Sequence, residues 1–141
     1  MRTQDNSSVA DEWMLQHGGV IDVTTLVLYE FRQGVHFQAW LHRHDRRKGY
    51  PAAEAEAMLA RLEENLALGI FRVAPVDWTA VHDLAGRLAA EHTTSSGARG
   101  FDLLHVASAS VLKATTFLSF DEGQRKVAAA CKLTVAPPAQ R

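Results

Sequence analysis

The fold is decided by residues 97–124, GARGFDLLHVASASVLKATTFLSFDEGQ, in which the hydrophobic period changes from helical to extended. Apolar side chains recur at helical spacing over residues 102–114, whereas residues 115–120 are rich in β-branched and aromatic side chains, as in a buried strand. Asp102 lies near the start of that helix, and Asp121 directly follows the strand. Because ligands of open parallel sheets bind beyond the carboxyl ends of the strands, Asp121 is placed where chemistry usually occurs.

The alternation of strands and helices continues on both sides of this stretch. Ser7 or Ser8 can cap a first helix, which Gly18-Gly19 ends. We expect further strands at 20–23, 70–73 and 133–135, and helices from about 25, over 52–68, over 78–91 and over 122–131, with a loop over 93–100. This order predicts an α/β fold with a mostly parallel sheet, in a single domain over 1–136 followed by a frayed tail over 137–141.

Composition excludes several classes of protein. The 141 residues are 47% hydrophobic and 22% charged, which is ordinary for a globular domain, and no window approaches the roughly 18 apolar residues of a membrane span. The first eight residues have no apolar core, so they are not expected to be a signal peptide, and a cytoplasmic protein is predicted. The single cysteine, Cys131, is interpreted as a buried, inert thiol.

The net charge of −1 creates no global attraction for nucleic acid, so any polyanion site must be local. The one basic cluster is residues 42–48, HRHDRRK, at the end of a predicted helix and before Pro51. It is either a solvated helix terminus, whose cations suit the negative end of the macrodipole, or a rim that contacts phosphates. A zinc site from His42 and His44 is not expected, because an i, i+2 pair points to different helix faces.

Three acids follow strand ends or lie on the helices beside them: Glu30, Asp102 and Asp121. Three carboxylates without His or Cys would form an all-oxygen site, which suits Mg²⁺ or Mn²⁺. Such an ion can generate hydroxide and neutralise a phosphodiester. The alternative is that the Asp residues are helix caps or first-turn residues.

Two motifs in the opening stretch give the chain a resemblance to a known family. Residues 99–109, RGFDLLHVASA, and residues 117–124, FLSFDEGQ, are similar to the R-x-x-D-x-x-H-V-A helix and the F-L-(T/S)-F-D strand end of the PIN-domain nucleases, especially the toxin ribonucleases of bacterial toxin-antitoxin pairs. Residues 133–135 resemble the closing strand of that family, and residues 24–30, TTLVLYE, resemble the segment that carries its second acid.

The resemblance implies a PIN-like three-layer fold and a metal-dependent RNA endonuclease. Glu30, Asp102 and Asp121 would hold Mg²⁺ or Mn²⁺, Ser119 would support the site by hydrogen bonding, and Arg99 would either anchor the loop or touch a phosphate or an acid. The partners it implies are an RNA substrate, an antitoxin protein and a second copy of the chain in a homodimer.

One departure from the family concerns its first strand, which ends in the first metal-binding acid. Residues 20–27, VIDVTTLV, mimic that pattern and make Asp22 a possible substitute, but no strand precedes the 52–68 helix to supply the acid that should follow. We therefore expect the first strand to be missing, which would leave the strands at 20–23 and 117–120 with unpaired edges. A start codon assigned too late is the preferred explanation, and an inactive remnant the next.

Competing functions follow from this departure. The alternative to a nuclease is a PIN-like remnant that only binds RNA or a protein. A nucleotide-binding regulator is not expected, because no predicted strand is followed by the glycine-rich phosphate loop that such a protein needs. Three prominent side chains have structural interpretations. His105 is expected to be a hydrogen-bonded core or supporting residue, and Trp40 and Trp78 are expected in the core.

Overall fold

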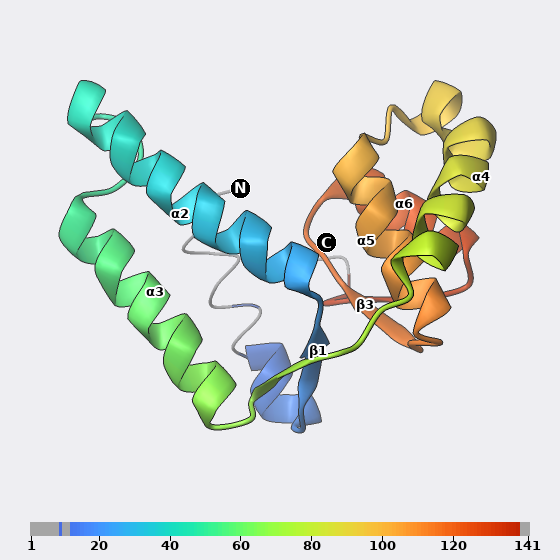
Figure 1. Cartoon of the computed structure of the whole chain (residues 1–141), viewed down its shortest axis with the longest axis horizontal. Coiled ribbons are helices and arrows are strands. Elements are labelled where there is room, and N and C mark those ends of the chain that lie inside the picture. The colour runs from blue at the N-terminus through green and yellow to red at the C-terminus, as the bar shows by residue number, and fades with distance from the viewer. Residues whose placement is uncertain (1–8, 10–11, 139–141) are drawn as a thin grey trace. The chain divides into compact units, whose positions relative to one another are not determined.

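The computed structural model describes residue 9 and residues 12–138 (Figure 1). It is an α/β structure that is mainly helical, with short parallel strand pairs. The chain forms two compact units, which we call the terminal unit (residues up to Gly18 and from Pro75 onward) and the hairpin unit (Gly19–Ala74). Each unit contains one pair of parallel strands.

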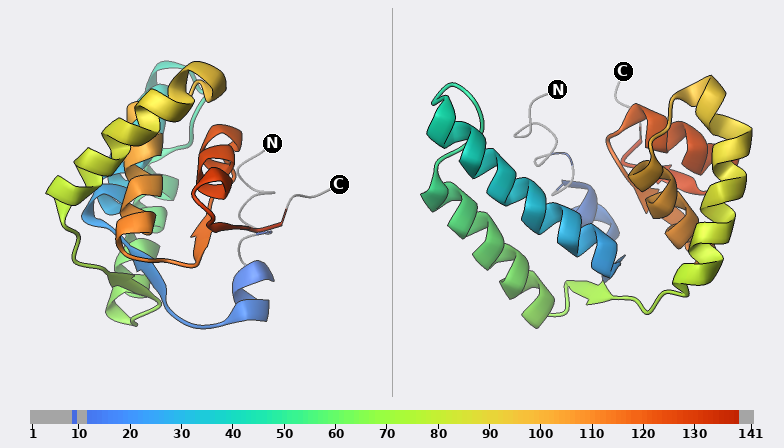
Figure 2. Two further views of the ribbon diagram at one scale, coloured as in Figure 1. Left: turned by 90° about the vertical axis from the view of Figure 1, so that its right-hand side faces the viewer. Right: turned by 45° about the horizontal axis from the view of Figure 1, so that its top comes forward.

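Three helices and a strand pair form the terminal unit from Pro75 onward. The elements in chain order are α4 (Trp78–Ser96), α5 (Gly100–Val111), β3 (Thr116–Leu118), α6 (Glu122–Ala130) and β4 (Thr134–Ala136). Figure 2 shows α4, α5 and α6 gathered together, and each of these helices contacts the other two. Val81 of α4, Val106 of α5 and Val127 of α6 are almost completely buried where these helices meet. Helix α6 begins at its N-cap, Asp121, and Val127 lies on the apolar face of this helix.

Strands β3 and β4 pair in parallel, with Phe117 opposite Val135. The ladder extends by one hydrogen bond at each end, from Thr134 N to the Thr115 carbonyl (2.9 Å) and from Ser119 N to the Ala136 carbonyl (3.0 Å). This pairing fixes the chain at the carboxyl end of β3, where Asp121 follows.

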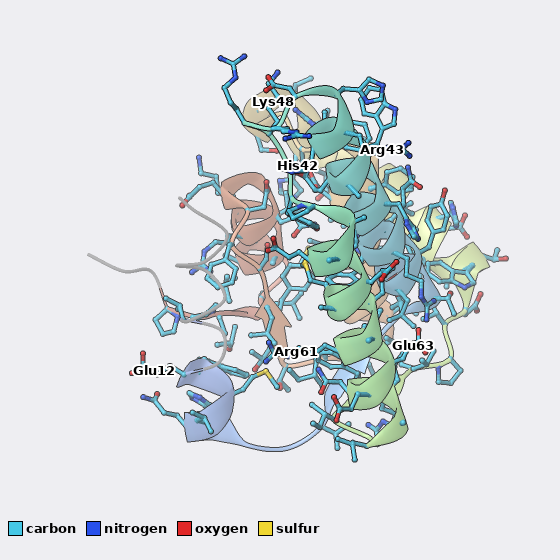
Figure 3. All side chains as sticks on the ribbon, turned by 90° about the vertical axis from the view of Figure 1, so that its left-hand side faces the viewer. Glu12, His42, Arg43, Lys48, Arg61 and Glu63 are labelled. Atoms are coloured by element: carbon cyan, nitrogen blue, oxygen red, sulfur yellow. The ribbon has the colours of Figure 1, made fainter. Side chains whose placement is uncertain are left out.

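The hairpin unit consists of two long helices and a second strand pair. Its elements are β1 (Ile21–Val23), α2 (Thr25–His44), α3 (Ala52–Ala67) and β2 (Phe71–Val73), with α2 and α3 side by side (Figures 1 and 3). Each helix buries a narrow apolar stripe, Leu28 and Val35 on α2 and Ala55 and Leu62 on α3. An ion pair between Arg32 Nη2 and Glu63 Oε1 (2.7 Å) joins the two helices at the surface.

The turn between α2 and α3 is held by several polar contacts. The imidazole Nδ1 of His42 hydrogen-bonds to the carbonyl of Lys48 (3.1 Å), and Asp45 accepts hydrogen bonds from the backbone and the guanidinium of Arg47. Gly49 has a positive φ of 61°, and a Cβ at this position would overlap the carbonyl oxygen of Gln38 in α2. Only glycine therefore lets the turn lie this close to the helix.

Most predicted elements are present, with four corrections. The expected loop over 93–100 is wrong at its start, because α4 continues to Ser96, where the Ser95 and Ser96 hydroxyls donate to the His92 carbonyl and Gly97 supplies the left-handed cap. The expected frayed tail is wrong at Pro137, which is buried and accepts a hydrogen bond from Arg125, whereas residues 139–141 lie outside the described part. The proposed caps Ser7 and Ser8 also lie outside it.

The other two corrections concern the sheet and a tryptophan. Instead of one continuous sheet, the described residues form two separate parallel pairs, β1 with β2 and β3 with β4. Each of the four strands pairs on one side only within the described part of the chain, and the expectation of a missing first strand stays a prediction. Trp78 packs against the core as expected, but Trp40 is 50% exposed, so its assignment to the core is wrong.

None of the helices within residues 12–138 has both the length and the apolar character needed to cross a bilayer.

The core of the terminal unit gives a matched pair of stability predictions. Val81→Ala should lower the free energy of unfolding by about 2–3 kcal/mol, because two fully buried methyl groups are lost and a cavity remains. Thr79→Ala removes a similar number of atoms from an exposed position of the same helix and should change the stability little. Urea unfolding of both variants measures the difference. Equal losses would mean that α4 does not bury Val81 as described.

The turn of the hairpin unit gives a second pair. Gly49→Ala should destabilise this unit by at least about 1–2 kcal/mol, the cost of the left-handed backbone alone, with the overlap at Gln38 added. Gly34→Ala, in the middle of α2 with open space around it, should instead stabilise by about 0.5–1 kcal/mol. Thermal unfolding followed by circular dichroism compares the two variants, and a Gly49→Ala protein as stable as the parent would contradict the close approach.

Candidate functional site

Asp121 begins α6 and caps it. The chain leaves β3 at Leu118, passes the nearly buried Ser119, and reaches Asp121, whose carboxylate Oδ1 accepts a hydrogen bond from the backbone N–H of Gln124 (2.8 Å). This is the ordinary bond of a helix N-cap, which explains the strong local preference for Asp here. The Asp121 side chain is otherwise exposed to solvent.

Asp102 lies in the first turn of α5 and is partly buried. Its Oδ2 accepts a hydrogen bond from the backbone N–H of Arg99 (3.4 Å), and its Oδ1 accepts one from the side-chain amide of Gln124 (3.2 Å). Gln124 therefore touches both acids, Asp121 through its backbone and Asp102 through its side chain. The structure brings these two predicted site residues together.

Ser119 completes this network and fixes the orientation of the Gln124 amide. Its hydroxyl accepts from the backbone N–H of Asp121 (3.1 Å) and donates to Oε1 of Gln124 (2.6 Å). Because an ionised carboxylate only accepts, the NH₂ of Gln124 must face Asp102, which leaves its oxygen for Ser119. The hydrogen bonds that link Asp121, Ser119, Gln124 and Asp102 thus have a consistent donor direction.

Two functional candidates carry positive charge beside this network. Arg125 Nη1 donates to the carbonyl of Ser119 (2.6 Å) and Nη2 to the carbonyl of Pro137 (2.8 Å), so its guanidinium ties the end of β3 to the segment after β4. Arg99 is the N-cap of α5 and is exposed, and its backbone N–H, not its guanidinium, makes the contact with Asp102.

The sequence analysis missed Gln124 and Arg125. Gln124 had a visible signal, because Asp121-Glu122-Gly123-Gln124 has the spacing of a capping box, in which the third helical residue reaches back to the cap. Here Ser119 takes the N–H of Asp121 and relays the bond to Gln124, so the amide NH₂ is released to bind Asp102. Arg125 had no such signal, because its acceptors are main-chain carbonyls.

Glu30 and Asp22 belong to the hairpin unit. Glu30 is partly buried on α2, one to two turns after Thr24, whose hydroxyl caps the helix by accepting from Val27 N (3.1 Å). Asp22 lies in β1 opposite Arg72 of β2, and its Oδ1 accepts a hydrogen bond from Arg72 Nε (2.8 Å). This bond raises the pKa of the Arg72 guanidinium, so Asp22 already has a cationic partner.

The donors around Asp102 and Asp121 match a hard divalent cation in type, because carboxylate, hydroxyl and amide oxygens are the ligands that Mg²⁺ and Mn²⁺ prefer. They do not by themselves make a complete cage. Among the described residues of either unit, no three His, Cys, Asp or Glu side chains lie together in a group that would hold a metal ion.

Cys131 lies at the far end of α6 from this pair. Burial raises the pKa of its thiol, although the residue is only partly buried, and no other cysteine is present to form a disulfide. A raised pKa keeps the sulfur in its less reactive protonated form. The prediction of an inert thiol agrees with this direction.

Comparison with family models, with curated proteins and with solved structures finds no match for this chain.

Proposed function

We propose that this protein is an Mg²⁺- or Mn²⁺-dependent RNA endonuclease of the PIN type, with a PIN-like arrangement of its strands and helices. The observation that supports the proposal is that a single residue, Gln124, contacts both acids: its backbone N–H donates to Asp121 and its side-chain amide donates to Asp102. These acids come from the two motifs that resemble the family.

Both carboxylates keep the capacity to bind a cation. An ionised carboxylate has about four acceptor sites, and the hydrogen bonds to Gln124 and Arg99 use one on Asp121 and two on Asp102. When bound, a divalent ion supplies an activated water at neutral pH and neutralises charge on a phosphodiester. Asp102 and Asp121 would hold it, and Glu30 is the third ligand that the resemblance implies.

The remaining residues position the pair. Gln124 orients the carboxylate of Asp102, Ser119 orients Gln124, and Arg125 fixes the strand end that carries Ser119. The exposed guanidinium of Arg99 is available to a phosphate, since its backbone alone contacts Asp102. In this proposal the enzyme acts on RNA as a toxin, restrained by an antitoxin protein, and forms a homodimer.

A second function is a PIN-like remnant that binds RNA or protein without catalysis. Two observations favour it. Among the described residues of the terminal unit, only two carboxylates contact the Gln124 network, and Asp22, the possible substitute for the family's first acid, is engaged by Arg72. Cation binding without RNA cleavage would support this alternative.

The acid pair gives a direct test of catalysis. Asp121→Asn and Asp102→Asn should each reduce Mn²⁺-dependent cleavage of structured RNA by at least about a hundredfold, because even outer ligands of metal sites contribute 10- to 100-fold. Asn is as good an N-cap as Asp, so Asp121→Asn should keep α6 folded. Asp83→Asn, at an exposed position of α4, is the matched control and should cleave like the parent. Cleavage unchanged in both site variants would exclude the proposed site.

The choice of the third acid is tested by cation binding without RNA. Glu30→Gln should weaken Mn²⁺ binding, followed by the electron paramagnetic resonance signal of the free ion, by roughly tenfold or more. Asp22→Asn should leave it unchanged, because Asp22 is paired with Arg72. The opposite pattern would make Asp22 the substitute ligand, and no loss in either variant would remove both from the site.

A further inference from the structure

The turn between α2 and α3 concentrates positive charge in a chain whose net charge is −1. Four cationic side chains, Arg43, Arg46, Arg47 and Lys48, lie within six residues that contain one acid, Asp45. Asp45 is engaged by Arg47, whereas Arg43, Arg46 and Lys48 are exposed and form no ion pair within the described part of the chain. Figure 3 shows Arg43 and Lys48 at the same end of the helical hairpin.

This charge is carried by a defined backbone. Asp45 N bonds back to the Leu41 carbonyl (2.8 Å), Lys48 N bonds to the Asp45 carbonyl (2.9 Å), and the Lys48 carbonyl is held by His42. Gly49 then passes against the backbone of Gln38. The cations therefore project from a closed turn, so less conformational entropy is lost when they bind a ligand than would be lost from a loose loop.

Aromatic rings lie beside these cations on α2. Trp40 is half-exposed and stacks on Phe37, with ring centroids 5.6 Å apart and planes 18° apart. On its other side the ring of His44 lies at 4.3 Å, tilted by 38°. Phe37 is 48% exposed and His44 is also exposed, so the rings at both ends of this row are accessible to solvent.

The helix dipole does not explain this arrangement. Its effect falls off within the last turn, which suits Arg43 but not Arg46 and Lys48, which come after α2 has ended at His44. Nor does it explain why large aromatic side chains stay in water next to the cations. Exposed rings beside a positively charged surface are the two components of single-stranded nucleic acid sites, where phosphates meet the cations and bases stack on the rings.

We propose that the α2–α3 turn is a binding surface for single-stranded RNA, in which Arg43, Arg46 and Lys48 contact phosphates and the Phe37–Trp40–His44 row stacks on bases. This site requires no metal ion and no cleavage, so it goes beyond the nuclease proposal and stands without it.

The charge contribution is tested in EDTA by the fluorescence anisotropy of a labelled single-stranded RNA of about 10 nucleotides, a length within the usual range of such sites. The triple variant Arg43→Gln, Arg46→Gln, Lys48→Gln should bind at least about tenfold more weakly at low salt. It should also make the negative slope of log affinity against log salt shallower by about 2, the value for three phosphate contacts on a single strand.

The matched control removes the same charge elsewhere. Arg61→Gln, Arg87→Gln and Lys126→Gln neutralise three exposed cations outside the turn, and Arg61 lies further along α3 (Figure 3). This control should bind RNA like the parent. Equal weakening in both triple variants would show only a general charge effect and would overturn the proposal.

The aromatic contribution and other anionic partners are tested separately. Trp40→Leu removes the middle ring and should weaken binding by roughly tenfold, in line with one lost stacking contact. Unchanged RNA binding by this variant would overturn the stacking role.

A second experiment uses vesicles of phosphatidylserine and phosphatidylcholine. If the protein binds these vesicles but not RNA, and the triple turn variant loses this binding, the partner of the turn is a membrane surface and not RNA. Because binding is measured in EDTA, the result does not depend on a metal ion or on cleavage, which separates it from the test of catalysis.

Discussion

The candidate site depends on one amide side chain, that of Gln124. Two carboxylates on different elements repel each other, and a cationic side chain between them would neutralise the pair. An amide is uncharged and carries both a donor and an acceptor, so it can bind Asp102 on one side and the Ser119 hydroxyl on the other. The backbone N–H of Gln124 also donates to the capping carboxylate of Asp121. Residues within one unit therefore fix the geometry of both acids, and the uncharged amide does not neutralise their charge.

Sequence reasoning predicted the positions of these acids because local rules determine them. Asp121 follows a strand and caps a helix, and Asp102 lies in a first turn, so both could be assigned from periodicity and capping preferences. The bond from Gln124 to Asp102 spans 22 residues and depends on how α5 and α6 pack. Spacing within one helix shows that Gln124 is in a capping position, but it cannot show which distant carboxylate its side chain meets.

The errors have a common physical origin. A hydrophobic period identifies the side chains that share a helix face, but not whether a partner covers that face. Trp40 was assigned to the core on this basis and is half-exposed, because α3 covers the stripe that contains Leu28 and Val35. The end of α4 was missed for a related reason. Ser95 and Ser96 favour loops by propensity, yet their hydroxyls bond to the His92 carbonyl and allow the helix to continue to the glycine cap.

The overall charge of the chain conceals a local concentration of cations. A net charge near zero argues against nucleic acid binding only when the charges are mixed evenly, and here they are not. The acid pair lies in the terminal unit, whereas the unpaired cations of the α2–α3 turn lie in the hairpin unit, each supported by its own backbone contacts. In the proposed nuclease, cations would give affinity for the phosphate backbone, whereas the acid pair would hold the metal ion for hydrolysis. Because these groups lie in separate units, a substitution in the turn can change the affinity without altering the hydrogen bonds that fix the acid pair.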